Sequence, residues 1–293
     1  MNSLAFVATL LSTLPSVKGF DVSKCISSKV ARGSAKFAAK SFCIDQRVQR
    51  CTDHLAATVN VTDPLITKNT MLREGRLTTV LDTWSNVLAR GLEGDWVETG
   101  TYKGGTSMLA ALLARAAQQS PACPTVSRNI WLADSFQGLP KARNEDKNKG
   151  RMDKEGSYND YGGVETVKHL FRKAGFAVAG PSKAAVGADL TVRFLKGWFS
   201  ETIKGAPIEK VALLRLDGDM YSSTMDTIRP LYPKLAPSGY LLVDDYGAHA
   251  WVVCGHYVHV CARTHAIHAD CRYLLRAHSA WYVHNHNNNN MYM

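Results

Sequence analysis

The sequence predicts an α/β fold with a mostly parallel β-sheet and helices on both faces. Short apolar runs recur along the chain, and segments with helical periodicity separate them. Strands that are buried on both faces read as such near-continuous apolar runs, and their alternation with helices is typical of parallel sheets. Acidic residues or glycines follow directly after several of the runs. In sheets of this kind ligands bind outside the carboxyl ends of the strands, so these positions are the first candidates for a functional site.

The individual elements follow from spacing and composition. Apolar residues between Leu77 and Leu88 recur at helical spacing, and strong helix formers fill 107–119. The pattern after residue 270 indicates a closing hairpin at 271–284. The expected helices are 77–88, 107–119, 164–174 and one from about Ser222, and the expected strands are 96–98, 130–134, 191–196, 211–217 and 240–245.

The two ends of the chain differ from its body. The apolar run from Leu4 to Leu14 is too short to span a membrane. Residues 1–43 are therefore expected to be a targeting leader or an N-terminal extension, with a signal peptide, a two-part organelle leader and an ordinary helix all left open. The expected compartment is the cytoplasm. If residues 1–43 are a cleaved leader, the expected destination is an organelle or the secretory route. Residues 44–284 are expected to form one domain, and 285–293 a disordered low-complexity tail.

Composition narrows the class of protein. A formal net charge of +10 suggests an acidic partner, but the basic residues are interleaved with acids and no nucleic-acid-binding motif accompanies them. We therefore expect neither nucleic-acid binding nor a stable membrane span. The seven cysteines contain no C-x-x-C pair, which favours reduced thiols, with a Cys43–Cys51 loop as the alternative in an exported protein. Eight of the ten histidines lie after residue 248, in no spacing that matches a zinc site.

Two strand ends indicate a cofactor site. The run 96–98 leads into Gly100, Gly104 and Gly105, and the run 130–134 ends in Asp134. Glycines at a strand-to-helix turn let a ligand approach the backbone, and an acid at the second strand can accept hydrogen bonds from ribose hydroxyls. Each signal has a plain structural explanation, a tight turn and a helix cap. Together they point to an adenosine-containing ligand.

A third group of acids indicates a metal site. Asp217 and Asp219 follow one central strand, and Asp244 and Asp245 follow another. Carboxylates that converge at one sheet edge repel one another unless a cation neutralises them. Oxygen ligands select a hard ion such as Mg²⁺, Mn²⁺ or Ca²⁺. We predict a metal held by Asp217, Asp244 and Asp245, with helix capping as the alternative for single acids.

Five motifs, in order from about Thr70 to Gly247, resemble the macrocin O-methyltransferase family: VETGTYKGG, WLADSFQGLP, FLKGWFSET, LLRLDGDMYSST and LYPKLAPSGYLLVDDYG. The resemblance implies a class I methyltransferase, Rossmann-like fold with a seven-stranded sheet whose last strand is antiparallel. It implies S-adenosylmethionine as methyl donor, Mg²⁺, and a hydroxyl of a sugar or glycosylated small molecule as acceptor. Whether the protein forms a homo-oligomer stays open.

The resemblance also assigns roles to residues. Asp217 is the expected catalytic base as well as a metal ligand. Tyr102 stands where the family frequently has Trp, and Thr70, Met71 and Tyr221 lie near the cofactor or acceptor in the family pattern. The expected cofactor-binding residues are Glu98, Gly100, Thr101, Tyr102, Gly104, Asp134, Ser135, Gly197 and Trp198.

Some features leave alternatives. After Gly247 the chain carries His256 and His259 where the family tends to have polar or acidic residues, which puts acceptor specificity in doubt. His249 is an alternative base. The long polar segment 141–163 is expected to be a lid over the acceptor, or a disordered insert. The rival functions are a catechol-type O-methyltransferase acting on a phenolic diol and a non-catalytic, methyltransferase-like binding protein.

Overall fold

The structure of the chain is a computed structural model, and it divides into two compact units, Met1–Arg47 and Val48–Met293. Of the first unit it describes only the backbone from residue 35 and the side chains of the last two residues. The expected leader, Asp245 and the histidines at 249, 256 and 259 lie outside the described part of the chain. The described residues are 35–143, 146, 155–182, 189–244, 272–277, 280–285 and 291–292.

Three helices, α3 to α5, come before the first described strand, and the others lie between strands of the sheet. The side chain of Asp63 begins α4 by accepting a hydrogen bond from the backbone N–H of Leu65 (2.8 Å), and Gly91, at φ 64°, ends α5 in the left-handed conformation that glycine adopts most readily. The helices are α3 (Ala35–Thr58), α4 (Pro64–Thr67), α5 (Glu74–Arg90), α6 (Gly105–Gln119), α7 (Gly163–Lys173), α8 (Phe199–Thr202), α9 (Tyr221–Leu231) and the 3₁₀ helix η2 (Tyr232–Lys234).

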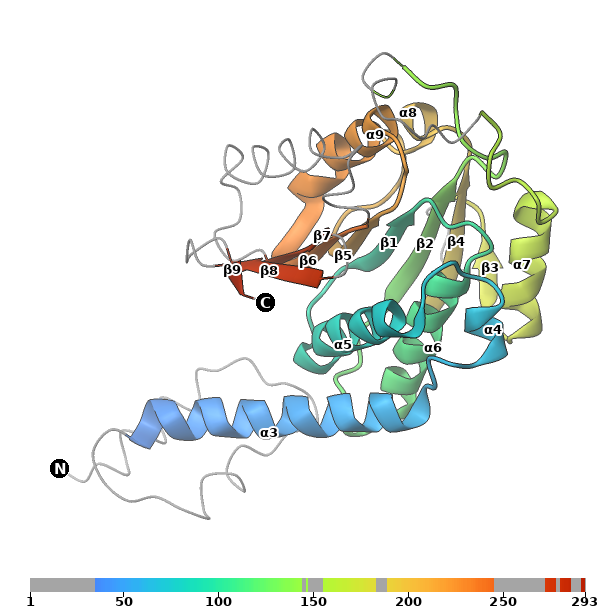
Figure 1. The fold of residues 1–293 in the computed structure, drawn as a ribbon. Coiled ribbons are helices and arrows are strands. Elements are labelled where there is room, and N and C mark those ends of the chain that lie inside the picture. The colour runs from blue at the N-terminus through green and yellow to red at the C-terminus, as the bar shows by residue number, and fades with distance from the viewer. Residues whose placement is uncertain are drawn as a thin grey trace. The chain divides into compact units, whose positions relative to one another are not determined.

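The sheet runs in the order β3-β4-β2-β1-β5-β6-β7-β8-β9, and its neighbours are parallel from β3 through β7 (Figure 1). The hairpin of β7 and β8 is antiparallel, as the sequence predicts, and β9 pairs antiparallel with β8. The strands are β1 (Asp95–Thr99), β2 (Arg128–Asp134), β3 (Ala177–Ala179), β4 (Leu190–Lys196), β5 (Val211–Leu216), β6 (Leu235–Val243), β7 (Arg272–Ala277), β8 (Ala280–Asn285) and β9 (Met291–Tyr292).

The predicted α/β class with a mostly parallel sheet is confirmed, but the strand count differs. The described part of the chain forms nine strands, not seven. The two that the pattern misses are the three-residue β3 and the two-residue β9, both at sheet edges. Runs this short carry too few residues for a periodic signal.

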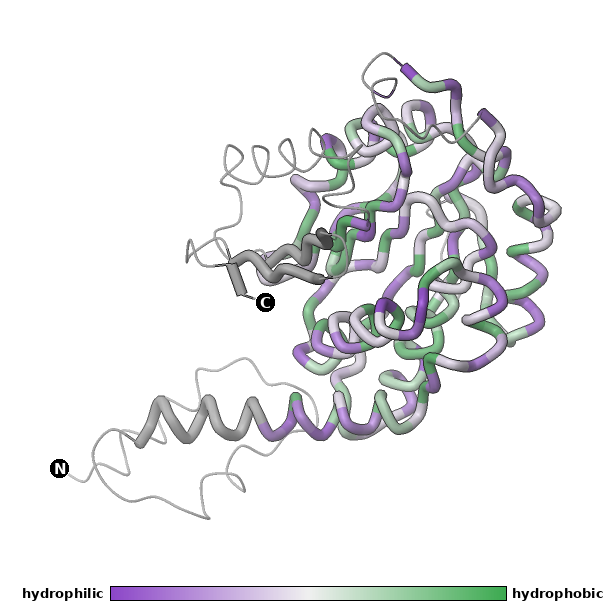
Figure 2. Tube along the Cα trace, in the orientation of Figure 1, coloured by the Kyte–Doolittle hydropathy of each residue, from purple (hydrophilic) through white to green (hydrophobic). Residues whose placement is uncertain are grey.

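The two faces of the sheet build two separate cores. Trp96 and Leu213 pack with residues of α5 and α6 on one face, while Val97 and Leu214 pack with residues of α9 on the other. This alternation is the two-residue period of a strand that is buried on both sides. Figure 1 shows α5 and α6 on one side of the sheet and α8 and α9 on the other, and Figure 2 shows hydrophobic residues along the central strands.

A disulfide joins Cys51 of α3 to Cys123, which follows α6 and lies 72 positions further along the sequence. The expectation of reduced thiols, or of a Cys43–Cys51 loop, is therefore wrong for Cys51. Both half-cystines are buried, and Cys51 packs beside Leu55 and Val59 in the core that contains α6. Only tertiary packing brings the two thiols together, so sequence spacing does not show the bond.

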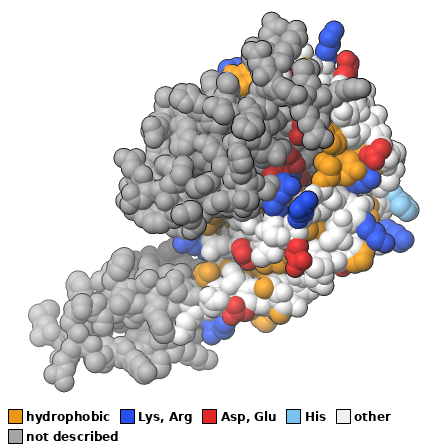
Figure 3. Space-filling model, viewed as in Figure 1, with side chains coloured by type: hydrophobic (Ala, Val, Ile, Leu, Met, Phe, Trp, Pro, Cys, Tyr) orange, Lys and Arg blue, Asp and Glu red, His pale blue; other side chains and the backbone are white. Residues whose placement is uncertain are grey.

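Charged side chains of both signs share the described surface. On the described part of the face in Figure 3, Lys and Arg side chains are interspersed with Asp and Glu. Lys210 pairs with Glu93 and Lys168 with Glu165, with N–O distances of 2.7 and 2.6 Å. Among the described residues, no helix is both long enough and apolar enough to cross a membrane.

Candidate active site

The turn after β1 depends on residues with positive φ. Gly100, Tyr102 and Gly104 have φ angles of 85°, 49° and 84°. A Cβ on Gly100 would lie 1.7 Å from the backbone oxygen of Asp217, so only glycine fits where β1 passes the end of β5. The turn then enters α6 at Gly105. The glycines predicted to open a ligand site thus also allow two strand ends to approach closely.

Asp134 organises this turn from the end of β2. Its Oδ2 accepts hydrogen bonds from the backbone N–H groups of Thr101 (2.7 Å) and Tyr102 (3.3 Å), and its Oδ1 accepts one from Phe136 (2.7 Å). Burial raises the pKa of the Asp134 carboxyl, and these hydrogen bonds oppose the rise. The carboxylate therefore lies in a fixed orientation beside the glycine turn.

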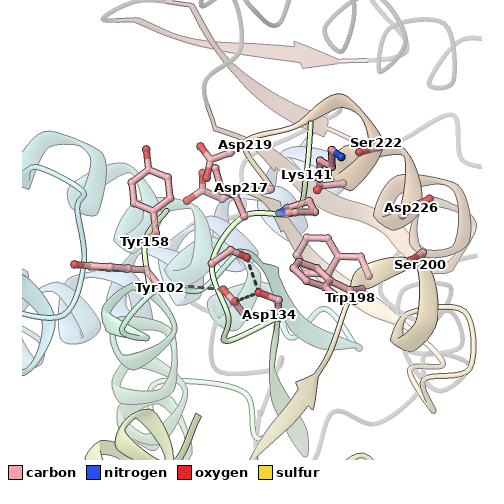
Figure 4. A pocket seen from close by; sticks show the side chains of 18 of the residues that line it. Tyr102, Asp134, Lys141, Tyr158, Trp198, Ser200, Asp217, Asp219, Ser222 and Asp226 are labelled. Carbon is pink, nitrogen blue, oxygen red and sulfur yellow. Dashed lines mark hydrogen bonds between the residues drawn. The ribbon is translucent and has the colours of Figure 1, made fainter. Parts of the chain in front are cut away.

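A cavity of about 360 Å³ opens at the carboxyl ends of β1, β2, β4 and β5. This is the size range of small-molecule sites. In Figure 4, Tyr102 and Tyr158 stand on one side of Asp134 and Trp198 on the other, with Asp217 between these two sides. The lining residues are Met71, Gly100, Tyr102, Asp134, Ser135, Gly138, Leu139, Pro140, Lys141, Arg143, Tyr158, Trp198, Phe199, Ser200, Asp217, Gly218, Asp219, Ser222, Ser223 and Asp226.

The acids at the strand ends meet an arginine. Nη2 of Arg215 lies 2.8 Å from Oδ2 of Asp217 and 2.5 Å from Oδ2 of Asp244, while its Nη1 lies 2.7 Å from Oε1 of Glu98. Arg215 and Glu98 are register partners on the adjacent strands β5 and β1. Burial disfavours charge on Arg215, but the three carboxylates outweigh it and raise its pKa. A second arginine, Arg76 of α5, contacts Oδ1 of Asp244 at 3.0 Å.

This arrangement corrects the electrostatic argument for a metal. Two of the three expected ligands, Asp217 and Asp244, are paired with the same guanidinium, and Asp244 is also paired with Arg76. Both oxygens of Asp244 accept hydrogen bonds from arginines. Among the described residues there is no group of three or more His, Cys, Asp or Glu placed to hold a metal ion. The third expected ligand, Asp245, lies outside the described residues.

The other expected residues divide into two groups. Gly100, Tyr102, Asp134, Ser135, Trp198 and Asp217 line the cavity. Glu98, Thr101, Gly104, Gly197 and Asp244 are not among its lining residues. Glu98 is fully buried beneath it, held by Ser107 of α6 and Arg215, and burial raises the pKa of its carboxyl against the effect of Arg215. Thr101 is buried, and its Oγ1 has no hydrogen-bond partner among the residues that the structure describes.

Sequence reasoning missed Arg215, Arg76 and Asp146. The sequence does contain a signal for Arg215, because it is a charged residue inside the apolar run VALLRLD. A buried charge needs a partner, so this position predicts an internal ion pair. Arg76 lies on an exposed-looking helix turn 168 residues from its partner, and Asp146 lies in a polar segment 75 residues before the backbone that it contacts. No local pattern marks either of them.

The fold and the cavity together define a Rossmann-like α/β protein with a small-molecule site at the carboxyl edge of its sheet. The profile of the macrocin-O-methyltransferase (TylF) family matches residues 35–282, and the chain belongs to this family. This membership accounts for the order of the five sequence motifs.

Relatives with named activities are similar over part of their length. The chain is 36% identical over 187 residues to an 8-demethyl-8-(2,3-dimethoxy-α-L-rhamnosyl)-tetracenomycin-C 4′-O-methyltransferase of Streptomyces olivaceus, covering 62% of this chain and 64% of that protein. It is 35% identical over 185 residues to a mycinamicin III 3″-O-methyltransferase of Micromonospora griseorubida, covering 61% and 65%. The matched region thus spans less than two thirds of these relatives. Among solved structures, the O-methyltransferase NovP matches with a TM-score of 0.55 and 27% identity, covering 82% of this chain and 97% of that one.

Proposed function

We propose that this chain is an S-adenosylmethionine-dependent O-methyltransferase acting on a hydroxyl of a sugar or glycosylated small molecule. One observation carries the proposal: a single cavity is lined by Gly100, Asp134 and Trp198 and also by the acid Asp217. The first three suit the binding of an adenosine-containing donor, and the fourth suits acceptance of a proton. Membership of the family and the printed activities of the two relatives support the reaction class and the glycoside acceptor.

The described residues fit the donor. Asp134 lines the cavity, and a carboxylate oxygen can accept a further hydrogen bond from a ribose hydroxyl, while Trp198 presents an aromatic ring on the opposite side (Figure 4). When bound, S-adenosylmethionine supplies a sulfonium methyl group as the electrophile.

Asp217 is the residue proposed to activate the acceptor. Its side chain is 25% exposed and its Oδ2 is held by Arg215, so the carboxylate is oriented toward the cavity from the end of β5. The acceptor hydroxyl gives its proton to Asp217 as its oxygen forms the new bond to the methyl carbon. The carbon–sulfur bond breaks, and the sulfonium becomes a neutral thioether. Fixed placement of the reacting groups is the protein's main contribution.

The requirement for Mg²⁺ or another hard divalent cation on Asp217, Asp244 and Asp245 stays a prediction. Oxygen donors at two neighbouring strand ends support it, and the pairing of two of them with Arg215 weighs against the repulsion argument. Assays with EDTA, and with Mg²⁺ restored, test this requirement separately from methyl transfer itself.

The function is tested with labelled methyl donor and a panel of glycosides and catechols. Transfer to a sugar hydroxyl is expected. Preferential transfer to catechols would favour the catechol-type alternative, and donor binding without transfer to any acceptor would favour the non-catalytic one. Asp217→Asn should reduce turnover by about 10²–10⁴-fold, the usual contribution of a general base, while donor affinity stays close to that of the wild type. Asp82→Asn, on the exposed side of α5, serves as the matched control.

A further inference from the structure

We propose that Asp146 is a positioning residue for the acceptor, because it joins two walls of the cavity that are far apart in sequence. The inference rests on the proposed function and concerns the same site. One wall is the segment 139–143 and the other is the beginning of α9.

The carboxylate of Asp146 is buried and is bonded on both sides. Its Oδ1 accepts a hydrogen bond from the backbone N–H of Tyr221, the first residue of α9 (2.8 Å), and its Oδ2 accepts one from the backbone N–H of Arg143 (3.2 Å). Only 5% of the residue is exposed. The residue at the N-cap position of α9, Met220, makes no capping hydrogen bond with its side chain. Asp146 therefore caps this helix from a different part of the chain, where an acid also interacts favourably with the helix dipole.

The described residues on either side of Asp146 in sequence pair with each other at Leu139, Gly156 and Ser157. The backbone N–H of Leu139 donates to the oxygen of Ser157 (3.1 Å), and that of Gly156 donates to the oxygen of Leu139 (2.9 Å). Gly138, at φ 85°, has no room for a Cβ, which would lie 2.4 Å from the oxygen of Ser157. These backbone hydrogen bonds hold Leu139 beside Gly156 and Ser157. The Asp146 carboxylate makes a separate attachment, to the backbone N–H of Tyr221 at the start of α9.

Both attached walls face the cavity. The segment contributes Leu139, Pro140, Lys141 and Arg143 to the lining, and the region around the start of α9 contributes Asp219, Ser222, Ser223 and Asp226. In Figure 4, Lys141 and Ser222 are both on the far side of Asp217 from Tyr158. The glycine turn and Asp134 are held by their own hydrogen bonds, which do not involve Asp146. Loss of the Asp146 carboxylate should therefore disturb the acceptor and leave the donor largely unaffected.

The first test separates the KM values of donor and acceptor. Asp146→Ala should raise the acceptor KM by about 5- to 30-fold, the range that loss of a helix cap implies, with the donor KM within about twofold of wild type. Asp146→Asn should retain most of the function, because its amide oxygen can still accept from Tyr221. Asp63→Ala is the matched control: it removes a comparable cap from α4 and does not line the cavity, so it should leave the acceptor KM unchanged.

The second test does not depend on activity. Hydrogen exchange, followed by mass spectrometry in wild type and Asp146→Ala, should show faster exchange in peptides containing 139–143 and 221–225 and unchanged exchange around Thr101. If the wild type transfers no methyl group, the proposed function fails. The hydrogen-exchange result then decides by itself whether Asp146 holds the two walls in place. Unchanged exchange in both walls overturns the inference. So does an acceptor KM that stays at the wild-type value in folded Asp146→Ala, or one that rises equally in Asp63→Ala.

Discussion

Nη2 of Arg215 lies 2.8 Å from Oδ2 of Asp217, and the guanidinium that makes this contact is itself buried in the sheet. The same group pairs with Glu98 and Asp244. The guanidinium of Arg215 thus links Asp217, which lines the cavity, to Glu98, which lies in β1 just before the glycine turn. The position of Asp217 depends on this cluster as much as on its own strand.

Replacing Arg215 with Met should destabilise the protein strongly. The change leaves three carboxylates without their common partner, and breaking a buried ion pair from one side costs about 3–5 kcal/mol. Urea unfolding measures the effect. Lys210→Met, which breaks only the exposed pair with Glu93, should change stability little, because surface pairs contribute little. Equal unfolding midpoints for the two variants would contradict the role given to Arg215.

Asp134→Ala should weaken donor binding about 10- to 100-fold, the range expected when hydrogen bonds to a charged group are lost. Part of the loss comes from the ribose and part from the turn, because the amides of Thr101 and Tyr102 lose their acceptor. Titration calorimetry with S-adenosylmethionine measures it. Ser135→Ala, which keeps these two contacts, is the comparison, and an affinity equal to wild type in Asp134→Ala would argue against a donor site at β2.

Asp95 should make the stability of the fold depend on pH. Burial raises the pKa of this carboxyl, although Asn129 and Trp131 donate hydrogen bonds to it. A raised pKa means that its contribution to stability is complete below the ordinary value of 3.8 and is lost as the pH rises through the folded-state pKa. The unfolding free energy of wild type minus that of Asp95→Asn should therefore fall as the pH rises from about 3.8, and then level off. A difference that grows with pH would show that the sign is wrong.

The Cys51–Cys123 bond should contribute about 2–4 kcal/mol, because it restricts a long loop in the unfolded chain. Reduction should lower the thermal unfolding midpoint of the wild type. The Cys51→Ser variant should start from this lower midpoint and show no further response to the reductant. Non-reducing peptide mapping identifies the bond directly, and a reductant response that persists in the variant would place the sensitive disulfide elsewhere.

Much of the fold could be predicted from sequence because its signals are local. The helical spacing from Leu77 to Leu88 and the apolar run that ends at Asp134 lie within α5 and β2. Asp134, Asp217 and Asp244 stand at or directly after the carboxyl ends of β2, β5 and β6, and parallel strands end on the same side of a sheet. The short β3 and β9 carry no periodic signal, and the Cys51–Cys123 bond depends on how distant segments pack.

Sequence patterns alone predict the alternation of strands and helices, the glycine turn, and the acids Asp134 and Asp217 at the strand ends. The contacts of each acid follow from the packing of distant segments. Register between β1 and β5 sets Glu98 beside Arg215, which also pairs with Asp217 and Asp244. A remote segment brings Asp146 to the start of α9. Periodicity and strand ends can be predicted because they are properties of neighbouring residues. The partner of a buried charge depends on register and packing between segments that can lie more than a hundred residues apart.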